Sequence, residues 1–117
     1  MSTRILVVDD SASFRRAASE LLHARGFRLL AAVGDGQAAL AAVAEERPDG
    51  VLLDVNLPGP DGLAVAASLT RRYPGLRIVL TSSELDDVPA RLLAASGAVA
   101  FVPKTDLVSA DLQRLFA

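Results

Sequence analysis

The sequence predicts an α/β domain with a doubly wound parallel sheet of five strands in the order 2-1-3-4-5, covered by five helices. Apolar runs of strand length occur in turn with stretches of helical period, and the runs lack polar alternation, which is typical of strands covered on both faces. Right-handed crossovers then place helices on both sides of the sheet. At 117 residues the chain has room for one such domain, expected to span 1–117. A closed eight-fold barrel needs about twice this length.

The strands are predicted from their continuous apolar character. Each is short, ends in a polar group or a turn, and is followed by a stretch with helical spacing. The order 2-1-3-4-5 suits five strands and puts the crevice between the first and third strands. The predicted strands are Ile5–Val8, Leu29–Val33, Val51–Leu53, Ile78–Thr81 and Val99–Val102.

Capping residues mark the starts of the first four helices. Their side-chain oxygens can accept hydrogen bonds from the free N–H groups of the first turn. Gly26 is placed to end the first helix in the left-handed conformation, and Pro89 is accommodated in the first turn of the fourth. The predicted N-caps are Ser11, Asp35, Asp61 and, for the fourth helix, Asp86 or Asp87.

The fifth helix is predicted at about Leu107–Phe116. Val108, Leu112 and Leu115 recur there at helical spacing, so we expect all three to face the core.

Composition excludes several classes of protein. The net charge is −2 and the eleven arginines are scattered, so this domain alone is not expected to bind nucleic acid. Arg15 and Arg16 are assigned to a solvated helix face. The chain has no cysteine, which excludes disulfides and thiol chemistry. Its longest apolar stretch, Ala38–Ala44, is far below the roughly 20 residues that span a bilayer, so we expect no membrane contact and a cytoplasmic location.

Polar side chains follow four of the predicted strands. Parallel strands end at the same edge of a sheet, so these side chains are expected to converge in one pocket. Lysine is used only once in the chain, at one of these ends. The residues are Asp9 and Asp10 after the first strand, Asp54 after the third, Thr81 and Ser82 at the end of the fourth, and Lys104 after the fifth.

The negative charges of three neighbouring carboxylates need to be compensated. Two carboxylates about 4 Å apart repel by roughly 4 kcal/mol at an effective dielectric near 20. Protonation or a hard cation could relieve this, and oxygen-only ligands favour Mg²⁺ or Mn²⁺. With Asp9 and Asp10 holding the metal, Asp54 can attack phosphorus to form an acyl phosphate, while Lys104 and the Thr81 hydroxyl contact phosphate oxygens.

This pattern resembles the receiver domain of two-component response regulators, which has a flavodoxin-like fold, over the whole chain. The resemblance implies that Asp54 accepts a phosphoryl group from a histidine of a sensor kinase or phosphotransfer protein. It implies Mg²⁺ on Asp9, Asp10, Asp54 and the backbone carbonyl of Asn56, with Ser82 among the cofactor-binding residues. The matching residues are Asp9-Asp10 after Ile5-Leu6-Val7-Val8, Asp54 within VLLDVNLPG, Thr81-Ser82, and Lys104 within FVPK.

The resemblance also implies a switch. Thr81 would move toward the phosphate and Phe101 would turn inward behind it, changing the surface of the fourth helix, fifth strand and fifth helix. That surface would signal to a downstream protein or to an output domain outside this chain, and the resemblance allows a homodimer through it. Phe101 lacks the phenol of many relatives, and Pro103 precedes Lys104 where many relatives have proline after it.

Single residues argue against two other functions that suit this fold. A haloacid-dehalogenase-like phosphatase would need an acid two residues after Asp54, where Asn56 stands. A flavodoxin-like flavin carrier would need a phosphate loop in place of Asp9 and Asp10, and the chain has no Gly-x-x-x-x-Gly-Lys loop. A receiver that only binds proteins is the nearer alternative. Apart from Mg-dependent self-phosphorylation and self-dephosphorylation, no enzymatic activity is expected.

Overall fold

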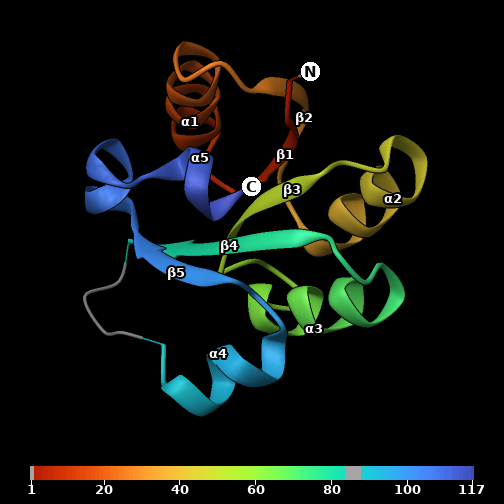
Figure 1. The fold of residues 1–117 in the computed structure, drawn as a ribbon. Helices are drawn as coiled ribbons and strands as arrows, with labels where there is room; N and C mark the ends of the chain where they lie inside the picture. Colours follow the sequence, from red (N-terminus) through yellow and green to blue (C-terminus); the bar gives the residue numbers. More distant parts are fainter. Residues whose placement is uncertain (1, 84–87) are drawn as a thin grey trace.

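A computed structural model describes residues 2–83 and 88–117, and its centre is one parallel sheet (Figure 1). The strand order is β2-β1-β3-β4-β5, and every neighbouring pair is parallel. This confirms the predicted fold class and strand order. The strands are β1 (Arg4–Val8), β2 (Arg28–Val33), β3 (Gly50–Asp54), β4 (Arg77–Ser82) and β5 (Ala100–Pro103).

Helices cover both faces of the sheet (Figure 1). Because alternate residues of a strand point to opposite faces, Leu6 and Val8 of β1 pack into one cluster while Ile5 and Val7 pack into the other. The first cluster includes α2 and α3 residues with Leu93 of α4 against it, and the second includes α1, η1 and α5 residues. The helices are α1 (Ala12–Ala24), α2 (Gly36–Glu46), α3 (Gly62–Arg72), α4 (Ala90–Ser96), the 3₁₀ helix η1 (Lys104–Ser109) and α5 (Leu112–Leu115).

The predicted N-caps of the first three helices are confirmed. The side chain of Ser11 accepts a hydrogen bond from the backbone N–H of Phe14, and Asp35 and Asp61 do the same at α2 and α3. Gly26 follows α1 with φ of +89°, the left-handed conformation that glycine adopts readily.

At the fourth helix the capping prediction falls outside the described residues. Asp86 and Asp87 both lie in the segment that the structure does not describe. Pro89 itself is the N-cap of α4, and its missing N–H costs nothing there because first-turn donors are unpaired in any helix.

The fifth helix is not continuous, so that prediction was wrong. The chain forms η1 and then the single turn of α5, separated at Ala110 by an extended backbone with ψ of 148°. Asp111 starts the new turn by accepting a hydrogen bond from the N–H of Arg114. Val108, in η1, is 68% exposed, so its expected place in the core was wrong, whereas Leu112 is buried and Leu115 is half-buried against the same cluster.

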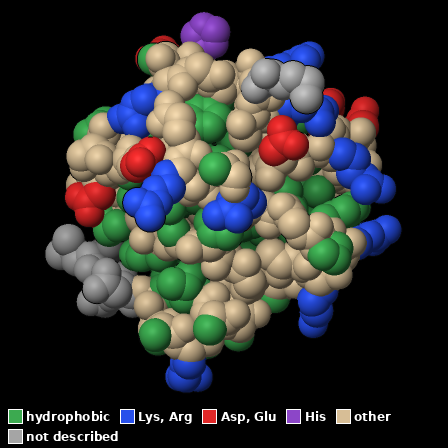
Figure 2. All heavy atoms as spheres, viewed as in Figure 1, with side chains coloured by type: hydrophobic (Ala, Val, Ile, Leu, Met, Phe, Trp, Pro, Cys, Tyr) green, Lys and Arg blue, Asp and Glu red, His purple; other side chains and the backbone are tan. Residues whose placement is uncertain are grey.

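Within residues 2–83 and 88–117, no helix combines the length and apolar character needed to cross a membrane. On the face drawn in Figure 2, Lys and Arg side chains are spread among apolar and acidic ones rather than gathered in a stripe. This agrees with the scattered arginines of the sequence.

Candidate functional site

The carboxyl ends of four strands bring the predicted polar side chains together. β1 and β3 are neighbours in register, with Val8 beside Leu53, so the residues that follow Val8 and the last residue of β3 lie at the same edge. Asp54 is the register partner of Thr81 on β4, and Lys104 directly follows β5. Residues about 95 positions apart in the chain thus meet because parallel strands share their direction.

Three carboxylates form the acidic cluster. One oxygen from each of Asp9, Asp10 and Asp54 lies within 4.8 Å of the other two. Asp9 is fully buried and Asp54 is 4% exposed, whereas Asp10 is exposed. The predicted convergence of the three acids is confirmed, with two of them removed from water and one at the rim.

Lys104 bridges the two buried acids. Its Nζ lies 2.7 Å from Oδ2 of Asp9 and 3.6 Å from Oδ2 of Asp54, and its side chain is 17% exposed. Asp9 Oδ2 accepts no well-oriented hydrogen bond from any described residue, so the contact with Lys104 is an ion pair rather than a directed hydrogen bond. The single lysine therefore lies where the sequence predicts it.

Backbone N–H groups hold the other carboxylate oxygens. The N–H of Ser11 donates to Oδ1 of Asp9 over 2.8 Å, and the N–H of Asn56 donates to Oδ1 of Asp54 over 3.1 Å. Each acid is thus anchored through one oxygen by the residue two positions later. The second oxygen of each, Oδ2, is left facing Lys104.

The two hydroxyl residues at the end of β4 differ in their surroundings. Thr81 is fully buried, and its Oγ1 has no hydrogen-bond partner among the described residues. Ser82 is also buried and accepts a hydrogen bond from Nδ2 of Asn56 over 3.0 Å. A buried hydroxyl without a hydrogen-bond partner lowers the stability of the folded state. The Thr81 hydroxyl is therefore available to donate to an acceptor that enters the site.

Phe101 lies on β5, beside Leu80 of β4. It is half-buried and packs against the cluster that contains α2 and α3 residues. The structure thus places it two strands from β3, the strand that ends in Asp54, and in contact with the core.

Burial raises the pKa of Asp54 from its usual 3.8 to about 6. Loss of water around the carboxylate is the largest cause, and the charge of Asp9 adds to it. The hydrogen bond from the N–H of Asn56 and the charge of Lys104 act in the opposite direction. A carboxylate in this state is poorly solvated, and a cation or a covalent bond that removes its charge is favoured.

Two further residues contact the site that sequence reasoning assigned elsewhere. The helical spacing of apolar residues in the first helix assigns Phe14 to the side that faces the sheet, yet the centroid of its ring also lies 4.1 Å from Nζ of Lys104. Nη1 of Arg15, assigned to a solvated face, donates to the backbone carbonyl of Asp9 over 2.6 Å. Both belong to the first turn of α1, so their position directly after the acidic pair was the available signal.

The residues fit a hard divalent cation. The cluster holds three carboxylates, and the cations that contact it among the described residues are Lys104, which contacts two of them, and Arg15, which contacts the backbone of Asp9, so excess negative charge remains. The donor set consists of oxygen atoms, the type that Mg²⁺ prefers over softer metals. Asp9 Oδ2 accepts no well-oriented hydrogen bond from a described residue and forms an ion pair with Lys104, so it would serve as a ligand if the ammonium shifted toward Asp54.

Comparison with known proteins gives the same family at three levels. The family model described as the response regulator receiver domain matches residues 5–113. The DNA-binding response regulator MtrA of Mycobacterium tuberculosis is 44% identical over 104 residues, which are 89% of this chain and 45% of that protein. A protein-glutamate methylesterase/protein-glutamine glutaminase of Paramagnetospirillum magneticum is 36% identical over 107 residues, covering 88% of this chain and 28% of that protein.

Solved structures agree. The signal receiver domain of the response regulator NarL from Mycobacterium tuberculosis superposes with a TM-score of 0.84 at 31% identity, over 97% of this chain and 96% of that one. The chemotaxis response regulator CheY4 of Vibrio cholerae gives a TM-score of 0.85 at 28% identity, over 98% and 99%. The chain spans less than half the length of the curated relatives named above. It belongs to the response regulator receiver domain family.

Proposed function

We propose that Asp54 is the phosphoacceptor of this receiver domain and that the domain works as a phosphorylation-controlled switch. The observation that carries the proposal is the position of Lys104, whose ammonium contacts Oδ2 of both Asp9 and Asp54. A phosphoryl group bonded to Asp54 would bring its oxygens to that ammonium. Accepting a phosphoryl group is the role of this family, so the site chemistry and the family agree.

The chemical step uses Asp54 as the nucleophile. A carboxylate oxygen of Asp54 attacks phosphorus, and the new O–P bond forms as the N–P bond of a phosphohistidine donor breaks. The electron pair of that bond stays on the imidazole, which leaves as the donor's histidine. Lys104 stabilises the charge that develops on one phosphoryl oxygen, and the unpaired hydroxyl of Thr81 donates to another.

Asp9, Asp10, Asp54 and the backbone carbonyl of Asn56 would hold Mg²⁺, or Mn²⁺ in its place. When bound, the cation would neutralise charge on the phosphoryl oxygens and on the acids. Ser82 would support this arrangement through its hydrogen bond with Asn56. Without a cation, a dianionic phosphoryl group would meet the uncompensated carboxylates.

Phosphorylation would be read out through Thr81 and Phe101. Once Thr81 donates to the phosphoryl group, it moves toward the acids and vacates space beside Phe101. The half-buried ring can then turn inward, by packing alone, since phenylalanine has no hydroxyl. The surface formed by α4, β5, η1 and α5 would change shape, and a downstream protein, an output domain or a second copy of the domain would recognise it.

A sensor histidine kinase or a phosphotransfer protein would supply the phosphoryl group in the cytoplasm, and residues 1–117 would form the whole receiver unit. The two curated relatives named above are both more than twice as long as the matched region. An output domain joined to this receiver would account for that difference. Catalysis would be limited to self-phosphorylation and self-dephosphorylation.

A small-molecule donor tests the proposal. Incubation with phosphoramidate and Mg²⁺ is expected to add the mass of one phosphoryl group, and Asp54→Asn is expected to abolish the adduct. Asp106→Asn is the matched control, because Asp106 is an exposed acid close to Lys104 in sequence but outside the acidic cluster. Absence of an adduct on the unmodified protein would favour a receiver that only binds proteins.

A further inference from the structure

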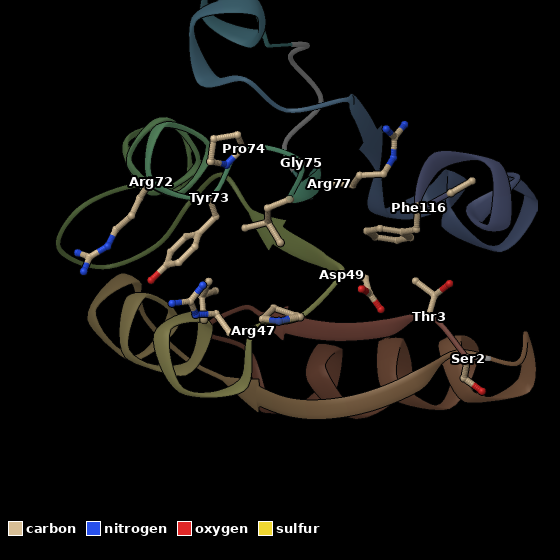
Figure 3. Close-up of a pocket in the computed structure, with 14 residues that line it drawn as sticks. Ser2, Thr3, Arg47, Asp49, Arg72, Tyr73, Pro74, Gly75, Arg77 and Phe116 are labelled. Carbon is tan, nitrogen blue, oxygen red and sulfur yellow. The ribbon is translucent and has the colours of Figure 1, made fainter.

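A cavity lies at the opposite end of the sheet from the acidic cluster. Its volume is about 830 Å³, within the range of roughly 300 to 1,000 Å³ that is usual for small-molecule sites. Thr3, Asp49 and Arg77 line it, at or just before the starts of β1, β3 and β4 (Figure 3). Because the strands are parallel, this end is a full strand length away from Asp54.

Two arginines and a tyrosine form one wall of the cavity. Cζ of Arg47 lies 4.8 Å from the ring centroid of Tyr73, and Cζ of Arg72 lies 5.9 Å from the same centroid. Figure 3 shows both guanidinium groups beside this ring. In the described part of the chain the only ion pairs are those of Lys104, so neither arginine has a carboxylate partner there. Asp49 also lines the cavity, but it forms no ion pair with either arginine, and its Oδ2 accepts a hydrogen bond from the N–H of Arg4. Two neighbouring positive charges without an ion-pair partner favour binding of an anion.

The backbone at Arg47 is held in an unusual conformation. It has φ of 48° and ψ of 62°, and among the described residues no other non-glycine has positive φ. This left-handed conformation is unfavourable for a residue with a side chain, because Cβ comes too close to the following carbonyl oxygen. The guanidinium of Arg4 donates to the carbonyls of Glu46 and Arg47 over 2.6 and 2.8 Å, and the N–H of Arg47 donates to the carbonyl of Val43. These contacts fix the backbone of Arg47 and therefore the direction in which its side chain leaves the chain.

The floor of the cavity is apolar. Val43, Pro48 and Phe116 are buried and Leu76 is half-buried, and all four line the cavity. A ligand that fits both parts needs an anionic group for the arginines and a flat or apolar portion for the floor. A phosphate monoester carries a charge of about −1.5 to −2 at neutral pH, which matches two guanidinium groups better than one carboxylate does.

We propose that this cavity binds a small organic phosphate, with its phosphate against Arg47 and Arg72 and its apolar portion on the floor near Val43 and Leu76. The site does not depend on phosphorylation of Asp54. Binding there would give the domain a second means of regulation, by a ligand at the amino ends of the strands rather than by phosphorylation at their carboxyl ends.

The probes are adenosine monophosphate, inorganic phosphate and adenosine, each titrated by amide NMR at low ionic strength with EDTA present. Chelation removes divalent ions from the acidic cluster, which then repels anions. Adenosine monophosphate is expected to shift amides of residues 43–49 and 72–77 and to bind at least about tenfold more tightly than either fragment, a difference of about 1.4 kcal/mol.

Substitutions separate the two arginines from general basicity. Arg47→Gly and Arg72→Ala are each expected to weaken adenosine monophosphate binding about tenfold, the loss of one charged hydrogen-bonding group. Both variants should fold, because glycine suits the left-handed conformation at position 47 and alanine is a good helix former at position 72, the last residue of α3. Arg71→Ala is the matched control, since Arg71 is an exposed neighbour on α3 that does not line the cavity. Its affinity should stay within about twofold of the unmodified protein.

Three results would overturn the proposal. One is the absence of amide shifts at adenosine monophosphate concentrations up to roughly 10 mM, where even a dissociation constant in the millimolar range is detectable. Another is an equal loss of affinity in Arg71→Ala, which indicates attraction by surface charge. The third is inorganic phosphate binding as tightly as adenosine monophosphate, because the apolar floor then contributes nothing.

Discussion

Replacing Asp54 by asparagine should stabilise the folded domain at pH 8 when divalent ions are absent. Asparagine keeps the size of the side chain and an oxygen that can accept the hydrogen bond from the N–H of Asn56. It removes the charge that burial and Asp9 disfavour. Asp9 remains 2.7 Å from Lys104, so the ammonium does not lose its nearer partner.

The size of the stabilisation by Asp54→Asn follows from the raised pKa of Asp54. A rise from 3.8 to about 6 corresponds to about 3 kcal/mol, at 1.36 kcal/mol for each pH unit. Because the folded state holds this proton more tightly than the unfolded state, the penalty is fully present above pH 6. It declines as the pH falls from about 6 to 3.8 and vanishes below 3.8, where both states are protonated.

Urea unfolding of the two proteins in EDTA at pH 8, 6 and 4 measures this difference directly. The variant is expected to exceed the unmodified protein by up to about 3 kcal/mol at pH 8 and to match it near pH 4. Adding Mg²⁺ at pH 8 should stabilise the unmodified protein, by about 2.7 kcal/mol at one hundred times its dissociation constant, and should have a much smaller effect on the variant. A variant that is less stable at pH 8, or a gain independent of pH, would refute the reasoning.

Three other substitutions test the surroundings of the site. Lys104→Arg should slow phosphorylation by phosphoramidate about tenfold, because a planar guanidinium cannot keep both of the lysine's contacts; an intact-mass time course with an unchanged rate would contradict this. Phe14→Leu should remove about 1 kcal/mol of cation–π attraction, slow the same reaction a few-fold and shift the single lysine side-chain resonance downfield through loss of the ring current. If that resonance stays in place, the ring does not contact the ammonium in solution. Gly62→Ala should cost about 2 kcal/mol or more in urea unfolding, since the added Cβ would lie 2.1 Å from the carbonyl oxygen of Asp54 and 2.7 Å from Cα of Val55. A loss below about 0.5 kcal/mol would show that the β3–α3 connection yields easily.

The strands and the first three helix starts could be predicted because their signals are local. An apolar run such as Ile5–Val8 reports a buried strand regardless of what packs on it, and a cap such as Asp61 bonds only three residues ahead. The prediction of a continuous fifth helix failed because its conformation depends on tertiary packing. The helical spacing of Val108 and Leu112 is real, but Leu107 and Leu112 are both buried in the same cluster, and the chain meets this requirement with a 3₁₀ turn and a break.

The polar residues of the site were also predictable, because topology alone brings the ends of parallel strands together. The burial and the hydrogen-bond partners of each residue were not predictable. Asp9 and Asp10 are adjacent and identical in type, yet one is fully buried and anchored by the N–H of Ser11 while the other is exposed. The contact between Phe14 and Lys104 joins residues 90 positions apart, and no pattern in either segment encodes it.

The sequence by itself determined the alternation of strands and helices, the order of chemical groups along the sheet edge and the presence of a single lysine among them. Only the tertiary structure decided which acids lose their water, which oxygen of each faces Lys104, and that Arg47 and Arg72 share the ring of Tyr73 at the far end. The physical reason is one of range. Periodicity and capping act over a few residues, whereas desolvation and charge pairing depend on every segment that packs around a group.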